Sequence, residues 1–348
     1  MTARVKVAVF GASGYTGLEL MRLLARHPGV ELTCITSREY QGRPVAEVFP
    51  ALADIVKLSF VAPDPAAIAS ATEVVFLAVP HKTAMEVVPP LLSAGVRVVD
   101  LSADFRFRDQ AVYEAWYQPH SAPELLMEAV YGLPELHRNK IRTARLVGNP
   151  GCYPTCVILG LAPLLKGRLV FPDSLIADCK SGVSGAGRGA SLTTSYCEVT
   201  DGLRAYKVGE HRHAPEMEQE LSLLSGKPAK ITFTPHLAPM SRGILGTLYA
   251  QLVKPLTDED ISKVYRAFYR DQPFVRLMPP GTWPSTQQVR GSNYCDLAIK
   301  VDRERGRVIV VSVIDNLTRG ASGLAVHNFN LMAGFPETLG LDTVPLAV

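Results

Sequence analysis

Residues 5–37 constrain the fold of this chain most, because three local patterns follow one another there at the spacing of a strand–helix–strand unit. Residues 5–10 (VKVAVF) are an apolar run rich in β-branched side chains, which predicts a buried strand. A glycine-rich turn, GASGYTG, follows at residues 11–17, and a second apolar run, VELTCITS, occupies residues 30–37. Between them, apolar side chains recur at helical spacing, at Leu18, Met21, Leu24 and Ala25. This order predicts a βαβ unit and therefore a parallel sheet.

The alternation of strand and helix patterns continues to about residue 150 and then gives way to longer strand patterns. The last of these, residues 293–317, folds back over a polar DRERGR turn, which predicts an antiparallel hairpin. The 348 residues are enough for two hydrophobic cores. We therefore predict an α/β fold, with a Rossmann-type parallel-sheet domain over residues 1–150 and an α+β domain with a mainly antiparallel sheet over residues 151–321. The later stretch SGLAVHNFNLMAGF predicts a final helix.

Composition excludes several classes of function. The net charge of +3 comes from 36 basic and 33 acidic residues with no basic run, so we expect no nucleic-acid partner. The sequence holds no apolar stretch of the roughly 20 residues that span a membrane, and its start shows no cleavable leader, so we expect a cytoplasmic protein without a membrane contact. The six cysteines form no CxxC pair and no repeating spacing, which favours free thiols over disulfides or a zinc site.

The glycine turn predicts a nucleotide site. At the junction of a strand and a helix, bare backbone can approach a pyrophosphate, and the helix N-terminus can face its charge. We expect the cofactor to bind residues of this turn, namely Gly11, Ser13, Gly14, Tyr15, Thr16 and Gly17. The spacing differs from the usual G-x-G-x-x-G, so a tight turn with only a structural role is the alternative reading.

The end of the second predicted strand indicates which dinucleotide binds. NAD-binding units usually carry Asp or Glu there to hold the ribose hydroxyls, whereas this chain has Thr36, Ser37 and Arg38. A hydroxyl and a guanidinium suit a 2′-phosphate, so we predict that Ser37 and Arg38 bind NADP(H), although Glu39 argues the other way.

Cys152 stands between a turn and an apolar helix pattern in GNPGCYPT, with Pro154 in the expected first helical turn. The positive end of a helix dipole lowers the pKa of a thiol, so this position favours a nucleophilic thiolate. The alternative is a buried cysteine that acts as a small apolar side chain, which is the interpretation we favour for Cys156.

A thiolate nucleophile needs a proton partner, and the segment VGEHRHAPE offers His211 and His213. A catalytic histidine is the interpretation we favour. Two alternatives remain open: both histidines are structural, or they bind a metal together with Glu216. Since no third histidine or cysteine lies near, we predict no metal site.

Two further loops follow predicted strands, where ligands gather in open α/β sheets. Arg106, in DLSADFRF, could bind a phosphate or carboxylate, or it could form a surface ion pair with Asp104 or Asp109. The loop KSGVSGAGRG, with Ser184 and Gly185, could approach a cofactor with its backbone, or it could be a flexible surface loop.

Six motifs in order, GASGYTG, DLSADFR, GNPGCYPT, SGVSGAGR, HRHAPE and DNLTRGASG, together resemble the N-acetyl-γ-glutamyl-phosphate reductases, which belong to the aspartate-semialdehyde dehydrogenase-like group. The resemblance covers nearly the whole chain. It implies that Cys152 is the nucleophile, that a histidine of HRH is the acid/base, and that Asn316 lies near the nicotinamide. Of the two histidines we favour His213 as the acid/base, because it immediately precedes APE, with His211 as a substrate or supporting residue. It also implies that a C-terminal helix, 322–348, completes the NADP-binding domain, and that domain 151–321 carries catalysis and assembly into a homodimer or homotetramer.

The activity implied by this resemblance is the NADPH-dependent reductive dephosphorylation of N-acetyl-γ-glutamyl phosphate to N-acetylglutamate 5-semialdehyde in arginine biosynthesis. Its partners would be the small acyl-phosphate substrate and inorganic phosphate. Cys152 would form a thioester, Arg106 would hold the departing phosphate, and His213 would donate a proton. The alternatives are a reductase of lysine biosynthesis that acts on a carrier-bound aminoadipyl phosphate, and a non-catalytic regulator that binds NADPH.

Overall fold

The computed structural model describes residues 4–346, so residues 1–3 and 347–348, which the predicted domain limits include, lie outside the described part. The chain divides into two compact units. The first consists of Met1–Pro150 with Ala321–Asp342, and the second of Gly151–Gly320 with Thr343–Val348. In the described residues no helix combines the length and the apolar character that crossing a bilayer requires.

The first unit contains a six-stranded sheet in the order β2-β1-β3-β4-β6-β5, and every strand pair in it is parallel. Its strands are β1 (Val5–Phe10), β2 (Val30–Ile35), β3 (Val74–Leu77), β4 (Arg97–Asp100), β5 (Val130–Tyr131) and β6 (Leu146–Gly148). Because β2 lies on one side of β1 and β3 on the other, the winding direction reverses between β1 and β3. Such a switch point is where doubly wound sheets bind ligands.

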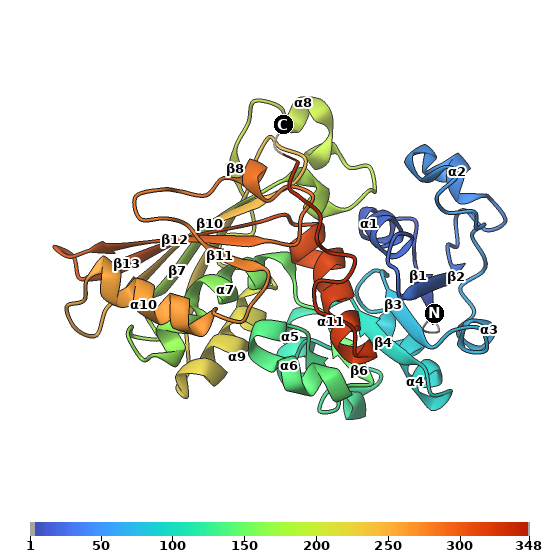
Figure 1. Ribbon diagram of the computed structural model, residues 1–348, viewed down its shortest axis with the longest axis horizontal. Helices are drawn as coiled ribbons and strands as arrows, with labels where there is room; N and C mark the ends of the chain where they lie inside the picture. The colour runs from blue at the N-terminus through green and yellow to red at the C-terminus, as the bar shows by residue number, and fades with distance from the viewer. Residues whose placement is uncertain (1–3, 347–348) are drawn as a thin grey trace. The chain divides into compact units, whose positions relative to one another are not determined.

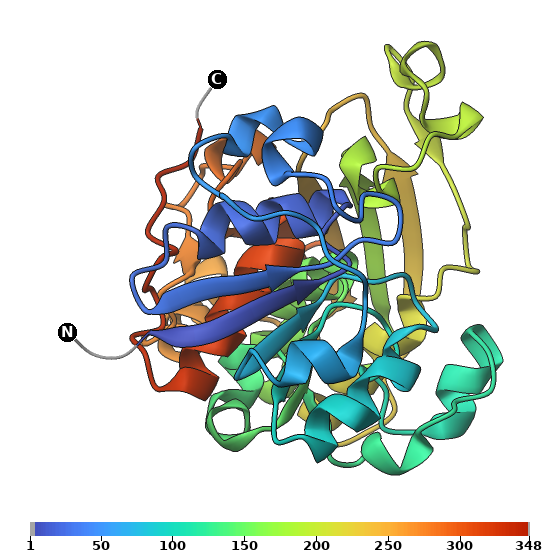
Figure 2. The same ribbon diagram turned by 90° about the vertical axis from the view of Figure 1, so that its right-hand side faces the viewer.

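Helices cover both faces of this sheet (Figure 2), because its strands are apolar on both sides. Along β3, Val75 and Leu77 pack with helix α4 (Ala84–Ser93) in one core cluster. Phe76 points to the opposite face, where its ring lies 5.7 Å from that of Phe329 in α11 (Gly323–Ala333). Helix α1 (Tyr15–Leu24) packs against α11. The remaining helices of the unit are α2 (Val45–Val48), α3 (Pro65–Ala69), α5 (Gln110–Trp116) and α6 (Pro134–Thr143).

The C-terminal helix is shorter than the predicted segment 322–348. Helix α11 ends at Ala333 because Gly334 adopts a left-handed conformation, with φ of 75°. The chain then turns back, and the Asn330 side-chain amide donates to the carbonyls of Glu337 and Leu339. Residues 343–346 belong to the second unit and form no helix.

The second unit contains a seven-stranded sheet in the order β11-β12-β13-β10-β7-β9-β8. Only the pairs β7–β9 and β11–β12 are parallel, so the sheet is mainly antiparallel, as predicted. The predicted hairpin is formed by β12 and β13. The strands are β7 (Leu175–Ser181), β8 (Arg204–Ala205), β9 (Ile231–Leu237), β10 (Ile244–Gln251), β11 (Val275–Leu277), β12 (Cys295–Asp302) and β13 (Arg307–Ile314).

Three helices, α7 (Cys152–Lys166), α9 (Ala214–Ser225) and α10 (Asp258–Phe268), pack on one face of this sheet (Figure 1). Side chains of β10 and β13 alternate between this face, where they are buried, and the opposite face. The opposite face carries side chains that are only half-buried, including Leu245, Tyr249, Ile309 and Val311.

Helix α7 bears Pro163 in its interior, and α10 repairs the resulting defect. Proline has no N–H group, so the carbonyl of Leu159, four residues earlier, loses its helical donor. The hydroxyl of Tyr269, the residue that follows α10, donates to this carbonyl. The hydroxyl of Tyr265 donates to the next one, that of Gly160, at 2.5 Å. Both tyrosines are buried, so the packing of α10 satisfies the backbone of α7.

We expect Tyr269→Phe to lower the free energy of unfolding by about 1–3 kcal/mol, because the Leu159 carbonyl would then stay buried without its donor. Urea unfolding monitored by circular dichroism measures this difference. Tyr249→Phe, on the half-exposed sheet face, is the matched control and should change stability by less than about 0.5 kcal/mol. Equal stability of the two variants would contradict the proposed repair of α7.

Candidate active site

The predicted site residues occur in both units, and the glycine turn occupies the β1–α1 junction of the first. Gly11 has φ of 83°, and a methyl group on its Cα would lie 2.8 Å from the carbonyl oxygen of Ala78, the residue that follows β3. A methyl group on Gly17 would lie 2.5 Å from the backbone of Ala12. Gly14, by contrast, has open space beside its Cα. Packing of the chain itself therefore requires Gly11 and Gly17, and Gly14 leaves the space that a ligand could enter.

This turn lies at the switch point of the sheet, since Gly11 follows β1 and Ala78 follows β3. Gly14 is the N-cap of α1, whose first turn holds no acidic side chain that would repel an anion. The hydroxyl of Ser322 donates to the carbonyl of Thr16 and fixes the start of this helix against the segment before α11. Tyr15 is exposed beside it. The arrangement suits a pyrophosphate, which the N-terminus of a helix and bare backbone can bind together.

The three residues after β2 have different surroundings. Thr36 is buried, and its hydroxyl accepts a hydrogen bond from the N–H of Gly11 at 2.9 Å. Ser37 is buried too, and its hydroxyl accepts from the N–H of Tyr40. Arg38 is exposed. Thr36 thus joins the end of β2 to the glycine turn, and Arg38 is the side chain of the three that can reach a ligand in solution.

Arg106 is buried in the loop after β4, which excludes a surface ion pair as its role. Its Nε donates to the carbonyl of Asn149 at 2.7 Å, and one terminal nitrogen donates to the carbonyl of Leu101 at 2.8 Å. Asn149 is itself fixed, because its side chain donates to the carbonyl of Ala321 and accepts from Asn328. Arg106 is therefore held rigidly by Asn149, which stands three residues before Cys152 in the sequence.

Two buried carboxylates lie close to Arg106 in the sequence: Asp100 ends β4, and Asp104 lies in the loop that follows it. Asp104 accepts from the N–H groups of Lys82 and Ala84 and from the hydroxyl of Tyr113, all within 3.0 Å. Burial, and then the charge of Asp104, raise the pKa of Asp100 to about 7. Through its bonds to Lys82 and Ala84, Asp104 joins the segment after β3 to the loop after β4, at the edge of the sheet where ligands bind.

Cys152 begins helix α7 in the second unit and is only half-buried, and a nucleophile needs such access to its surroundings. The helix start is fixed by Glu216 in the first turn of α9, whose buried carboxylate accepts a hydrogen bond from the N–H of Gly151 at 2.8 Å. Cys156, one turn further, is fully buried against Ser312, and burial raises its pKa to about 12. Of these two thiols only Cys152 can act on a substrate.

The structure brings His213 to the residue before Cys152. A methyl group on the Cα of Gly151 would lie 2.6 Å from Nε2 of His213, so the imidazole lies directly on the backbone at the start of α7. On another side, a methyl group on Gly320 would lie 2.8 Å from Cβ of Cys152. The two glycines give the imidazole and the thiol-bearing residue the room to approach the backbone around them.

His211 is buried among aromatic rings and supports His213. Its Nδ1 accepts the backbone N–H of His213 at 3.1 Å, so this nitrogen is unprotonated. The ring centroids of Tyr153, Tyr206 and Phe233 lie 5.3–5.7 Å from that of the His211 imidazole. The rings of Tyr153 and Phe233 lie 5.1 Å apart, and all four of these ring pairs meet edge to face. Burial lowers the pKa of His211 to about 4, so it is neutral at physiological pH. Its surroundings suit a supporting residue.

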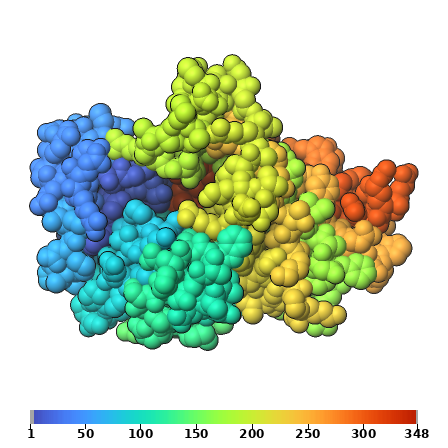
Figure 3. Space-filling model, turned by 180° about the vertical axis from the view of Figure 1, so that it is seen from behind, coloured from blue at the N-terminus to red at the C-terminus, as the bar shows by residue number. Residues whose placement is uncertain are grey.

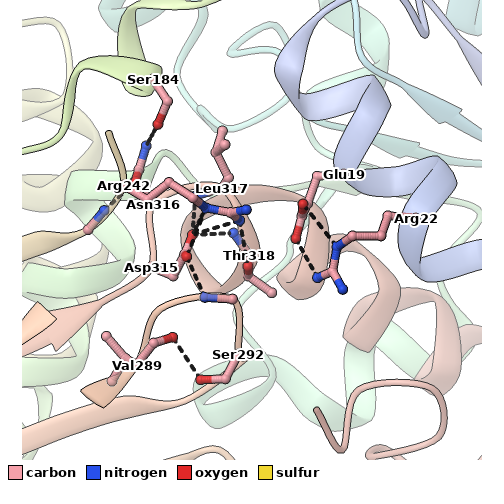
Figure 4. Close-up of polar contacts among 12 residues, drawn as sticks. Glu19, Arg22, Ser184, Arg242, Val289, Ser292, Asp315, Asn316, Leu317 and Thr318 are labelled. Carbon is pink, nitrogen blue, oxygen red and sulfur yellow. Dashed lines mark hydrogen bonds and ion pairs between the residues drawn. The ribbon is translucent and has the colours of Figure 1, made fainter. Parts of the chain in front are cut away.

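Asn316 follows β13 and binds two loops. Its side-chain oxygen accepts the N–H of Gly243 at 2.7 Å, and its nitrogen donates to the hydroxyl of Ser184 at 2.9 Å (Figure 4). The loop with Ser184 and Gly185 is further held by backbone hydrogen bonds to residues 240–243. The early part of this loop, residues 182–185, is therefore anchored and is not a flexible surface loop.

Asp315, just before Asn316, is a fully buried carboxylate that organises this region (Figure 4). It accepts hydrogen bonds from the backbone N–H groups of Gly291, Leu317 and Thr318 at 2.7–3.0 Å. It also forms an ion pair with Arg242, at 3.0 Å. The sequence interpretation did not single out Asp315, although its place in DNLTRGASG after a long strand could have indicated it.

Glu216 was also missed as a site residue, because the sequence interpretation considered it only as a metal ligand. The signal was its position: it stands third in α9, after Pro215, where acidic side chains often bind backbone N–H groups at helix starts. The described residues contain no group of three His, Cys, Asp or Glu side chains arranged to hold a metal ion.

Comparison with known proteins identifies two family domains in the chain. Residues 6–144 match the semialdehyde dehydrogenase NAD binding domain, and residues 152–316 match the semialdehyde dehydrogenase dimerisation domain. Two similar relatives are the N-acetyl-gamma-glutamyl-phosphate reductases of Syntrophobacter fumaroxidans and Geobacter metallireducens. Each is 61% identical over 98% of this chain and 99% of its own length.

Solved structures of aspartate semialdehyde dehydrogenases share the fold. The Vibrio cholerae enzyme II in complex with ASA has a TM-score of 0.72 at 16% identity, over 96% of this chain and 99% of its own. The Candida albicans enzyme with NADP has a TM-score of 0.71 at 15% identity, over 95% and 99%. These likenesses confirm the predicted combination of a Rossmann-type sheet and a mainly antiparallel sheet.

The lowered pKa of His211 predicts a pH dependence of stability. Between pH 6.5 and 4 the unfolded chain protonates this histidine and the folded chain does not, so stability falls as the pH falls through this range. The loss attributable to His211 is on the order of 2 kcal/mol between pH 6.5 and 4.5. His211→Asn, whose side-chain oxygen can still accept the N–H of His213, should lack this part of the loss. Urea unfolding at a series of pH values measures it, and parallel pH curves for the two proteins would refute it.

Proposed function

The chain belongs to the N-acetyl-γ-glutamyl-phosphate reductases of the semialdehyde dehydrogenase family, and from this premise we propose that it converts N-acetyl-γ-glutamyl phosphate to N-acetylglutamate 5-semialdehyde with NADPH, through a thioester on Cys152. The observation that carries the proposal is the half-buried Cys152 at the start of α7, with the His213 imidazole against the backbone of the preceding residue. A reductive step of this kind serves arginine biosynthesis in the cytoplasm, where we propose that the protein acts.

The residues present fit a dinucleotide with a 2′-phosphate. The open space beside Gly14 at the start of α1 can admit the pyrophosphate, and the exposed guanidinium of Arg38 can bind the 2′-phosphate at the end of β2. The anchored loop of Ser184 and Gly185, held by Asn316, is the element of the second unit that we propose for the nicotinamide end. When bound, NADPH supplies the hydride that reduces the thioester carbonyl.

Cys152 performs the first chemical step in this proposal. Its thiolate attacks the acyl carbon of the substrate; a sulfur–carbon bond forms, the carbon–oxygen bond to phosphate breaks, and inorganic phosphate departs. The N-terminus of α7 favours the negative charge on the sulfur before this step and again when the product leaves. Cysteine suits the reaction because it splits one difficult displacement into two easier steps.

His213 and Arg106 assist at the two ends of the reaction. The imidazole of His213 takes the proton of the Cys152 thiol and donates it to the oxygen that becomes negative when the thioester carbonyl is reduced. It takes this proton back from the hydroxyl as the intermediate collapses, the carbon–sulfur bond breaks, and the aldehyde and the thiolate are released. His211 holds the backbone of His213 through its Nδ1. We propose that Arg106, fixed by the carbonyls of Leu101 and Asn149, binds the departing phosphate through its guanidinium.

We further propose that the protein is a homo-oligomer, a homodimer or a dimer of such dimers. The second unit matches a family dimerisation domain. Helices α7, α9 and α10 pack on one face of its sheet, and no helix of the described residues packs on the opposite face as α7 does on the first. The centre of this face is apolar and half-buried, with Leu245, Tyr249, Ile309 and Val311 on adjacent strands. Such a face favours pairing with the same face of a second copy.

The purified protein should reduce NADP⁺ in the presence of N-acetylglutamate 5-semialdehyde and phosphate, and should prefer this aldehyde to aspartate semialdehyde. Cys152→Ser should lower the rate by roughly a thousandfold or more while NADP⁺ binding persists, because serine is a much weaker nucleophile here. His213→Gln should lower kcat by about 10²–10⁴-fold. Absorbance at 340 nm follows the reaction.

Cys197→Ser is the matched control for this experiment, because Cys197 is the exposed thiol among the cysteines, and its replacement should leave the rate unchanged. Substantial activity in Cys152→Ser would remove Cys152 from its role as nucleophile. Phosphate-independent activity would contradict the acyl-phosphate step itself.

The preference for NADPH should depend on Arg38. We expect Arg38→Ala to raise KM for NADPH about tenfold or more and to leave KM for NADH nearly unchanged, because only NADPH carries the 2′-phosphate. Glu39→Ala, at the exposed neighbouring position, is the control and should not weaken NADPH binding. A wild-type protein that uses NADH and NADPH with equal kcat/KM would refute this assignment.

A further inference from the structure

Residues 188–209 form a surface arm between β7 and α9. The arm contains the short turns Leu192–Thr194 and Tyr196–Val199 (α8) and the edge strand β8, which pairs with β9. Its own hydrogen bonds shape it: the hydroxyl of Ser195 donates to the carbonyl of Leu192 at 2.9 Å. The side chain of Arg204 also donates to the carbonyl of Thr193. The arm therefore has a defined local structure.

The apolar side chains of this ordered arm point mostly to solvent. Leu192 is 77% exposed, Tyr196 79%, Leu203 59% and Val208 58%, whereas Val199 is buried. Figure 3 shows the arm in yellow-green on the surface of the molecule. Single exposed apolar residues are common, but four large ones within 17 successive positions mark a surface that another molecule covers.

The charges of the arm indicate what this molecule is. Residues 188–209 carry three basic side chains, Arg188, Arg204 and Lys207, and two acidic ones, Glu198 and Asp201. A surface of mixed sign has no preference for a polyanion or a strongly basic partner, whereas it can complement a copy of itself. The arm also extends from the sheet of the domain that matches the family dimerisation domain.

We propose that the arm packs against a second copy of this chain through Leu192, Tyr196, Leu203 and Val208. The proposal rests on the homo-oligomer proposed above and adds to it a contact region outside the half-exposed sheet face.

The root of the arm adjoins the proposed acid/base, so this contact bears on catalysis. The hydroxyl of Tyr206 lies 3.0 Å from that of Tyr153, and its ring lies 5.7 Å from that of His211. His211 in turn accepts the N–H of His213. A partner that fixes the arm therefore also fixes Tyr206 in the aromatic group that positions the HRH segment.

Cys197 gives a direct readout, because this exposed thiol lies in α8 beside Tyr196. In the full-length wild-type protein, the rate at which a bulky maleimide modifies Cys197 is measured by mass spectrometry over a range of protein concentrations, in parallel with the mass in solution from light scattering. We expect modification to be at least tenfold slower in the oligomer than after dilution to the monomer.

The variant Leu192→Asp/Tyr196→Asp should shift the mass towards the monomer and expose Cys197 at all concentrations. The milder Leu192→Ser should weaken assembly in the same direction without adding charge. Met127→Asp is the matched control, since Met127 is as exposed as Tyr196, at 79%, but belongs to the first unit. This control should keep the wild-type mass and the wild-type protection of Cys197.

The outcomes separate this inference from the proposals above. An oligomer in which Cys197 reacts as fast as in the monomer, or which persists in the double arm variant, would overturn the role of the arm and leave the homo-oligomer standing. The role of the arm would also be overturned if adding NADP⁺ slowed the modification of Cys197 while the mass of the protein in solution stayed constant. A fully active wild-type monomer at all concentrations would remove both the homo-oligomer and the arm contact, but not the reductase activity.

Discussion

The hydrogen bond from the N–H of Gly151 to the buried carboxylate of Glu216 fixes the geometry on which the rest of the candidate site depends. The first N–H groups of a helix have no partner within it, so the start of α7 needs an external acceptor. Because this acceptor stands in the first turn of α9, the bond holds two helix starts together. One helix start carries Cys152, and the other is preceded by His213.

Buried carboxylates play the same part elsewhere in the chain. Asp104 in the first unit and Asp315 in the second each accept at least two backbone N–H groups from loops that follow strands. A charge-assisted hydrogen bond is stronger than a neutral one, and a buried carboxylate that accepts several of them is costly to displace. Each carboxylate therefore makes a loop rigid where the fold would otherwise leave a mobile connection, and these loops carry the residues proposed to bind the ligands.

The sequence predicted what is encoded locally. The run of apolar residues, glycine turn and helical spacing over residues 5–37 specified the β1–α1–β2 unit, and the hairpin β12–β13 followed from two strands around a polar turn. Contacts between distant residues were not predictable in this way. Glu216 and Gly151 are 65 positions apart, so no local pattern reveals their bond. The left-handed Gly334 ends α11 near the end of the apolar pattern, and well before the end of the segment 322–348 that the family resemblance implied.

The two cysteines of α7 show why local environment, and not residue type, decides which thiol can react. Both belong to the same helix, one turn apart, yet Cys156 faces β10 and β13, where burial raises its pKa and the carbonyl of Ser312 lies 3.3 Å from its sulfur. Cys152 lies at the start of the helix, where the positive end of the helix dipole favours negative charge, and it is only half-buried. Moving the thiol by a single turn would place it inside the core, so the position of the helix start relative to the sheet determines whether this chain has a nucleophile.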